Sequence, residues 1–203
     1  MVRLNKNVER GTATREHVLR VATRLFAERG YEGTSIDTVL TEAGISRGSL
    51  YHHFNGKDAL FEAVLGAVET DVNRRTLAAA TAEEDPVAML SAGCQAWVRM
   101  AGDPVVQRIL LRDAPAVLGW QRWREFDEGY ALGMIKAAMS AIAAAGHLDH
   151  ALVDVFAHVV MASITEIALL VARAEDPEPA AAAGAAAVDE VLRRLLRPAD
   201  PVA

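Results

Sequence analysis

The stretch AGISRGSLYHHF, Ala43 to Phe54, places a glycine directly before a short helix with an unusual polar and aromatic surface. On a wheel of about 100° per residue, Leu50 and Phe54 point to one side, whereas Gly48 and His52 point away from them. A helix that buried its polar rings for stability would place them beside Leu50 and Phe54. The pattern therefore predicts a helix that is anchored by its apolar side and exposes a polar face.

The residue types on this face favour an anionic partner. Arg47 stands at the open N-terminus of the predicted helix, where backbone N–H groups favour phosphate. Arginine can donate two hydrogen bonds to guanine, and serine, tyrosine and histidine can bind bases or phosphate oxygens. These properties indicate DNA. A solvated surface helix and a protein-contact face stay open as alternatives on these residues alone.

Helical periodicity continues on both sides of this stretch, and alanine, the strongest helix former, is abundant. Thr14 and Ser35 are good N-caps, and Gly30 and Gly44 are good helix stops. The predicted fold class is all-α. We expect helices over residues 14–30, 36–43, 46–54, 57 to beyond 73, 86–100, 104–113, 120–145, 148–174 and 179–196.

Two short helices around a glycine turn make a helix-turn-helix. The acidic AEEDP at residues 82–86 marks the predicted domain junction.

The first part of the chain is more basic than the rest. Residues 1–60 hold nine Arg and Lys against seven Asp and Glu, whereas the remainder holds twelve against twenty. We expect a flexible arm over residues 1–13 and a helix-turn-helix DNA-binding domain over 14–65, whose last helix continues to about 80. A C-terminal helical domain for ligand binding and dimerisation is expected over 86–197.

Composition excludes several other classes of protein. The chain of 203 residues is 52% hydrophobic and 24% charged, which is typical of a globular protein. We expect no membrane span, no signal sequence and a cytoplasmic location. Cys94, the single cysteine, cannot form an internal disulfide and is read as a core residue. No motif of an enzyme, metal site or cofactor site is recognised, so we predict no catalysis, no metal and no cofactor.

The segment TREHVLRVATRLFAERGYEGTSIDTVLTEAGISRGSLYHHFNGKDALFEAVL, residues 14–65, resembles the N-terminal DNA-binding domain of the TetR/AcrR family of transcriptional regulators. His53 matches the family pattern, but its flank position is equally compatible with packing. Asp37 is a departure, because an acid near the groove repels phosphate; we expect it to favour the positive end of the second helix. The resemblance implies that the operator is contacted by Ser35, Thr38, Arg47, Gly48, Ser49, Tyr51 and His52, with Lys57 holding a phosphate.

The resemblance also implies a C-terminal domain that dimerises through its last two long helices. The helix from Leu148 carries an apolar arc too wide for one contact face, and alanines in the last helix permit close packing. We predict a symmetric homodimer; a monomer whose central helix is enclosed by its own neighbours is the alternative. The residues predicted at the interface are Phe156, Val160, Ile164, Ile167, Val188, Val191, Leu192 and Leu195.

A small-molecule pocket is the other implied feature of this domain. Aromatic and methionine side chains with a few polar groups suit an apolar or aromatic ligand, although most of them can equally be ordinary core. His158 and Glu166 lie on an otherwise apolar helix and need partners if they are buried. The predicted pocket residues are Trp97, Met100, Trp120, Trp123, Phe126, Tyr130, Met134, His158, Met161 and Thr165.

These expectations define one functional hypothesis and one alternative. The hypothesis is a ligand-responsive repressor whose homodimer binds a palindromic double-stranded DNA operator and is released by a small apolar or aromatic effector. The alternative is an all-helical protein-interaction module without specific DNA binding, which predicts no salt-dependent affinity for DNA.

Overall fold

The computed structural model describes residues 2–196, apart from the side chains of residues 2–10, Asp127 and Tyr130. All regular elements in this part of the chain are helical, as the all-α prediction requires. Their bounds are α1 (Val2–Gly33), α2 (Ile36–Ala43), α3 (Arg47–His53), α4 (Lys57–Ala80), α5 (Pro86–Met100), η1 (Val106–Asp113), α6 (Ala114–Leu118), α7 (Trp120–Ala144), η2 (His150–Leu152), α8 (Val153–Arg173) and α9 (Pro177–Leu195).

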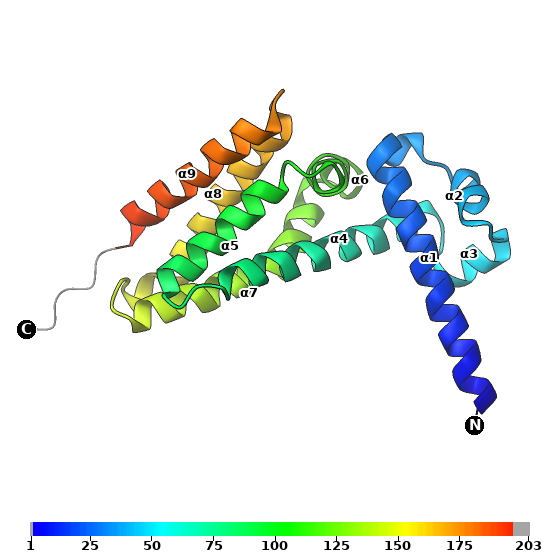
Figure 1. Ribbon diagram of the computed structural model, residues 1–203, viewed down its shortest axis with the longest axis horizontal. Helices are drawn as coiled ribbons and strands as arrows, with labels where there is room; N and C mark the ends of the chain where they lie inside the picture. Colours follow the sequence, from blue (N-terminus) through cyan, green and yellow to red (C-terminus); the bar gives the residue numbers. More distant parts are fainter. Residues whose placement is uncertain (1, 197–203) are drawn as a thin grey trace, which may run out of the picture.

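The helices form a head and a body joined by one long helix (Figure 1). The head contains α1, α2 and α3, and α4 runs from the head into the body along α5. The body contains α5, α7, α8 and α9, while η1 lies beside the end of α1 and α6 packs against η1 and α7. Because α4 belongs to both parts, a displacement of this helix in the body reaches the head.

The head is held together by a core of large apolar side chains. Leu50 and Phe54 of the opening stretch are buried with 0% and 3% of their surface exposed, as their spacing predicts. The ring of Phe26 in α1 meets that of Phe61 in α4 edge to face at 5.2 Å between centroids. These contacts fix α3 on α1 and α4, so its opposite side faces solvent.

Several helix boundaries differ from those predicted. The first helix begins at Val2 rather than at Thr14, and the residues before Thr14 contain no proline that would interrupt it. The segment expected as an arm therefore continues α1. Asp149 caps the short η2 through the amide of Ala151, so the next long helix begins at Val153.

The segment Val106–Asp113 is π-helical, and the short α6 follows it directly. The sequence predicts a helix here, but apolar spacing over eight residues does not separate a π-helix from an α-helix. The wider π turn is uncommon and often accompanies functional positions. In this fold it carries Arg108 and Asp113 to the end of α1.

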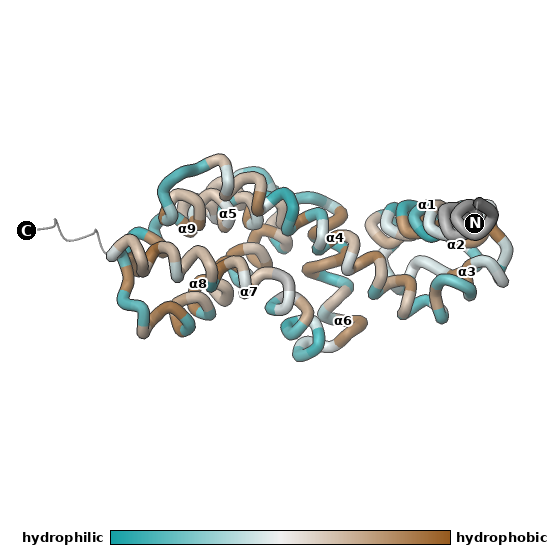
Figure 2. Tube along the Cα trace, turned by 90° about the horizontal axis from the view of Figure 1, so that it is seen from below, coloured by the Kyte–Doolittle hydropathy of each residue, from teal (hydrophilic) through white to brown (hydrophobic). Residues whose placement is uncertain are grey.

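The segment formed by η2 and α8 is unusually apolar. The segment His150–Arg173 has the length and composition of a membrane-crossing helix, with a mean hydropathy of 2.1 over its most apolar window. Apolar colours dominate α8 in Figure 2. Half of that window is buried inside the body, as in the core helix of a soluble protein.

Gly184 marks the closest packing of α9 against the body. A Cβ at this position would lie 2.7 Å from Val98 Cγ1 and 2.8 Å from Ile167 Cγ2, and both neighbours are β-branched and stiff. An alanine in mid-helix gains about 1 kcal/mol over glycine, but overpacking costs about 1–3 kcal/mol. The close contact is therefore expected to outweigh the gain in helix propensity.

We expect Gly184→Ala to lower the melting temperature by about 2–4 °C, which corresponds to about 1 kcal/mol for a chain of this size. Gly133→Ala is the matched control, because Gly133 is exposed within α7 and a Cβ there would meet nothing within 4 Å. It is expected to raise the melting temperature by a similar amount. Thermal unfolding followed by circular dichroism measures both; an increase for Gly184→Ala would contradict the packing argument.

Candidate functional site

Local hydrogen bonds fix the geometry of the helix-turn-helix. The side chain of Ser35 accepts the amide of Thr38 at 3.1 Å and caps α2, and Ser46 accepts the amide of Ser49 at 3.2 Å and caps α3. Between them, Gly44 adopts the left-handed conformation with φ of 63°. Each of these residues acts on its own neighbours in sequence, which is why both helices were predictable.

The outward face of α3 carries the residues expected to contact an operator. Arg47, Gly48, Tyr51 and His52 are exposed, and 46% of the large Tyr51 side chain is accessible. An exposed tyrosine beside an arginine at a helix N-terminus is suited to phosphate and base contacts. Ser35 is also exposed, whereas Ser49, Thr38 and Lys57 are half-buried at the edges of this face.

Asp37 has a partner that the sequence did not indicate. Its carboxylate forms an ion pair with the Arg47 guanidinium, which links the first turn of α2 to the first turn of α3. Both side chains are more than half exposed, and such pairs contribute little to stability. Asp37 therefore holds Arg47 at the N-terminus of α3 while leaving it free to exchange this carboxylate for another acceptor.

His53 packs against the head. It is half-buried, and a Cβ at Gly11 would lie 3.9 Å from its Cε1 atom, so the ring faces α1. Its ring also meets that of His52 at 5.0 Å between centroids. Of the two roles that the sequence left open, the structure favours packing.

Lys57 lies over the ring of Tyr31, with its ammonium nitrogen 4.0 Å from the ring centroid. The Tyr31 hydroxyl donates a hydrogen bond to Asp58. Burial, followed by the hydrogen bond to Asp58, raises the pKa of Tyr31 to about 12. The tyrosine is therefore neutral at physiological pH and presents an intact ring to the cation.

The head and body meet at a junction formed by Gly30, Tyr31, Arg108 and Asp113. The Tyr31 amide donates to Asp113 Oδ2 at 2.6 Å, and Arg108 Nε lies 3.3 Å from Asp113 Oδ1. Gly30 has a φ of 73°, and a Cβ there would lie 1.9 Å from Arg108 Nη2. Glycine therefore suits this turn, and a side chain here would strain the backbone and displace the Arg108 guanidinium. The junction ties Tyr31, and through it Lys57, to the body.

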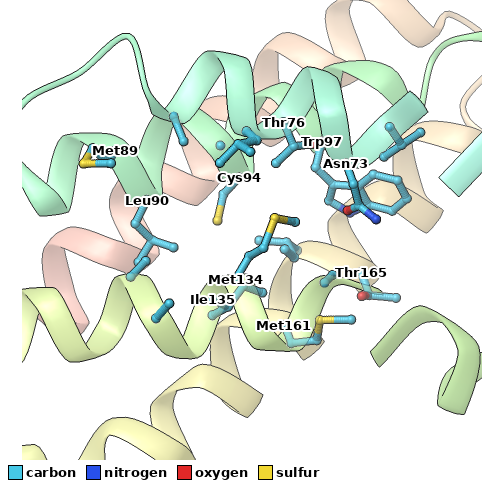
Figure 3. A pocket seen from close by; sticks show the side chains of 18 of the residues that line it. Asn73, Thr76, Met89, Leu90, Cys94, Trp97, Met134, Ile135, Met161 and Thr165 are labelled. Atoms are coloured by element: carbon cyan, nitrogen blue, oxygen red, sulfur yellow. The ribbon is translucent and has the colours of Figure 1, made fainter. Parts of the chain in front are cut away.

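A cavity of about 360 Å³ lies in the body between α4, α5, α7 and α8 (Figure 3). Four of the predicted pocket residues line it: Trp97, Met134, Met161 and Thr165. The sequence missed the contribution of α4, which supplies Glu69, Asn73 and Thr76. The sequence did contain a sign that Glu69 faces inward, because it lies four residues after Leu65 and three before Val72, on the apolar stripe of its helix.

Of the other predicted pocket residues, those whose side chains the structure describes do not line this cavity. The cavity borders α7 from Ala131 onward, whereas Trp120, Trp123 and Phe126 lie earlier on that helix. Trp123 is buried core and Trp120 is 54% exposed. The remaining three predicted pocket residues are Met100, His158 and Tyr130. Met100 is part of the core at the end of α5, His158 is exposed, and the side chain of Tyr130 lies outside the described residues.

The predicted interface residues divide between core and surface. Val160, Ile164, Val188 and Leu192 are buried inside the chain's own body, so they are unavailable to a second copy. Phe156, Ile167, Val191 and Leu195 are half-buried. The choice was wrong for the buried four because α8 and α9 are apolar on more than one side, and apolar character alone does not identify the side that packs inward.

The exposed side of α8 carries a different apolar stripe. Val155, Val159 and Leu170 are exposed by 57%, 40% and 60%, and their spacing places them on one side of the helix. Glu166 lies on the same side and is exposed. Neither Glu166 nor His158 therefore needs a partner inside the chain. We name Val155, Val159, Ala162, Glu166 and Leu170 the α8 stripe.

A short helix fixed by a glycine turn on a small helical head, with a polar outer face and a separate helical body, defines a helix-turn-helix DNA-binding regulator of transcription. Family comparisons agree with this class. Residues 18–64 match the family described as bacterial regulatory proteins, tetR family, and residues 87–195 match the tetracyclin repressor-like C-terminal domain. The chain belongs to the TetR family of transcriptional regulators.

Individual relatives support the same assignment. A TetR-family regulator from Pectobacterium atrosepticum is 32% identical, with 95% of this chain and 98% of that chain covered and a TM-score of 0.80. The regulator AcrR of Shigella flexneri is 35% identical over 72 residues, which are 36% of this chain and 34% of the relative. The repressor AcnR of Corynebacterium glutamicum is 41% identical over 56 residues, 28% of this chain and 30% of the relative. The matched segments thus span about a third of these two curated relatives.

Proposed function

We propose that this protein is a cytoplasmic repressor that binds a palindromic operator as a homodimer and is released by a small molecule. The observation that carries the proposal is the outward face of α3, where Arg47 and Tyr51 are exposed on a helix held rigidly by Leu50 and Phe54. The name of the relative AcnR supports repression. Two copies would present two such helices to successive major grooves, which lie about 34–36 Å apart.

Ser35, Thr38, Gly48, Ser49 and His52 complete the proposed DNA-binding surface, and Lys57 is its proposed phosphate contact. Arg47 is the residue assigned to base reading, because a guanidinium can bond guanine at two atoms. Residues 14–65 form the DNA-binding domain in this proposal, and residues 86–197 the ligand-binding and dimerisation domain. Residue 197 lies outside the described residues.

The α8 stripe supports the homodimer. Exposed apolar side chains gathered on one side of a helix are stabilised by a partner, and a two-fold interface places the same surface on both subunits. The exposed alanines of α9, which are Ala182, Ala183, Ala186 and Ala187, would permit close packing of a helix from a second copy. The proposed interface is therefore the outer side of α8 with α9.

Two connections between cavity and head support release by a ligand. The cavity and Lys57 lie on the same helix, α4, so a ligand that displaces α4 moves the base of the head. The junction at Asp113 fixes the end of α1 on η1 and makes the head follow the body. A coupling free energy of about 1–3 kcal/mol is enough to change operator affinity by about 5- to 150-fold.

Selection of bound sequences from a randomised duplex DNA library tests the proposal with the full-length protein. We expect enrichment of an inverted repeat whose half-sites are centred about one helical turn apart. The affinity for the selected duplex is expected to fall steeply with salt and to exceed that for a shuffled duplex by about 10³-fold or more. Equal affinity for both duplexes at every salt concentration would overturn specific DNA recognition.

A further inference from the structure

The cavity in the body has a polar end and an apolar end. Figure 3 shows Asn73 and Thr165 at the end where Trp97 lies, and Met89 and Leu90 at the opposite end. Glu69 precedes Asn73 by one turn on the same side of α4, and only 2% of its surface is exposed. A carboxyl group, an amide and an indole ring are thus gathered at one end of an otherwise apolar space.

The charges around the cavity have one sign. Among the described residues that line it, Glu69 and Cys94 are the only ionisable groups, and no lysine, arginine or histidine is present. Burial raises the pKa of the Cys94 thiol to about 12, so this group stays neutral at physiological pH. The described part of the cavity wall therefore offers a ligand a carboxyl group but no cationic side chain.

The residues that line the cavity favour ligands of one charge over ligands of the other. A carboxylate or phosphate ligand would bring a negative charge into an apolar space that offers no cation to match it. A cationic ligand would be matched by Glu69, and its presence would favour the ionised form of that carboxyl group. The Trp97 indole adds a face that attracts cations, and Met134 and Met161 adapt to the shape of an apolar body.

We propose that the cavity binds a lipophilic organic cation, an amine or quaternary ammonium compound with an alkyl or aryl body. The nitrogen lies at the end formed by Glu69, Asn73 and Trp97, and the apolar body extends toward Met89 and Leu90. This inference rests on the proposed ligand response, because it names the chemical class of the effector for the same cavity.

Three probes of one shape test the charge preference by calorimetry on the full-length protein without DNA. They are 4-phenylbutyltrimethylammonium, its uncharged tert-butyl isostere, and 5-phenylpentanoate. We expect the cation to bind about tenfold or more tightly than the isostere, and the carboxylate to bind most weakly. Binding of the isostere or the carboxylate as tightly as the cation overturns the inference, as does the failure of the cation to bind.

Glu69→Gln keeps the size of the side chain and removes its charge. We expect this variant to lose about tenfold in affinity for the cation and to bind the isostere unchanged. Glu62→Gln is the matched control, because Glu62 lies on the same helix outside the cavity and pairs with Arg122. An unchanged cation affinity in Glu69→Gln overturns the role of this residue. If Glu69→Gln does not fold, the comparison of the three probes on the parent protein decides by itself.

The same probes distinguish this inference from the proposed ligand response. If the cation binds preferentially but leaves operator affinity unchanged, the charge preference stands and release by this ligand fails. If the isostere matches the cation and still weakens operator binding, the ligand response stands and the charge preference fails. Fluorescence anisotropy of the selected duplex, titrated with each probe, measures the change in operator affinity.

Discussion

Replacing Leu170 with glutamate is expected to convert the proposed dimer into monomers and to weaken operator binding by about 10²–10⁴-fold. Leu170 is 60% exposed on the α8 stripe, and a two-fold interface brings this surface against its own copy. A buried, unpaired carboxylate is costly, so a glutamate from each subunit opposes association. The loss in DNA affinity follows because two linked heads bind two half-sites with a high effective concentration, whereas single heads do not.

Leu77→Glu provides the matched control for this experiment. Leu77 is 52% exposed on α4, where it borders the cavity but lies outside the α8 stripe and α9, so the same change in charge and size is expected to leave the oligomeric state unaltered. Sedimentation equilibrium measures association and fluorescence anisotropy measures operator binding. A Leu170→Glu protein that sediments like the parent would exclude the α8 stripe as the interface.

Arg47→Ala is expected to reduce affinity for the selected operator by about 5- to 150-fold per half-site, because a bidentate arginine–guanine contact is worth about 1–3 kcal/mol. Discrimination against the base that it reads is expected to relax at the same time. Arg74→Ala is the control, since Arg74 is likewise an exposed arginine in an ion pair, with Asp71, but lies along α4 outside the proposed DNA-binding surface. If Arg47→Ala and Arg74→Ala bind the operator equally well, Arg47 has no role in recognition.

Asp37→Asn tests whether the Asp37 carboxylate positions the Arg47 side chain for its proposed contact with a base. The variant removes the ion-pair partner of Arg47 and one negative charge from the proposed DNA-binding surface. We expect affinity for shuffled DNA to rise and the ratio of specific to shuffled affinity to fall, because Arg47 is less restrained. An unchanged ratio would mean that the carboxylate does not position Arg47 for base reading.

The sequence identified the head with little ambiguity because its signals are local. Ser35, Gly44 and Ser46 act on backbone groups within a few residues, and Leu50 and Phe54 are separated by one helical turn. Such signals need no knowledge of distant segments. The same reasoning could not find the Asp37 ion pair or the junction at Asp113, since both depend on side chains brought together by the turn of the chain or by packing.

In the body, the sequence by itself determined that the helices exist and are strongly apolar, and tertiary structure decided what each apolar side does. Val160 and Leu170 are indistinguishable as apolar positions of α8, yet the first is 1% exposed and the second 60%. Likewise, Trp97 borders the cavity whereas Trp123 fills the core. The physical reason is that the hydrophobic effect is non-directional. The spacing of apolar residues shows which sides of a helix can be buried, but the packing of the other helices determines which of these sides is buried within the chain.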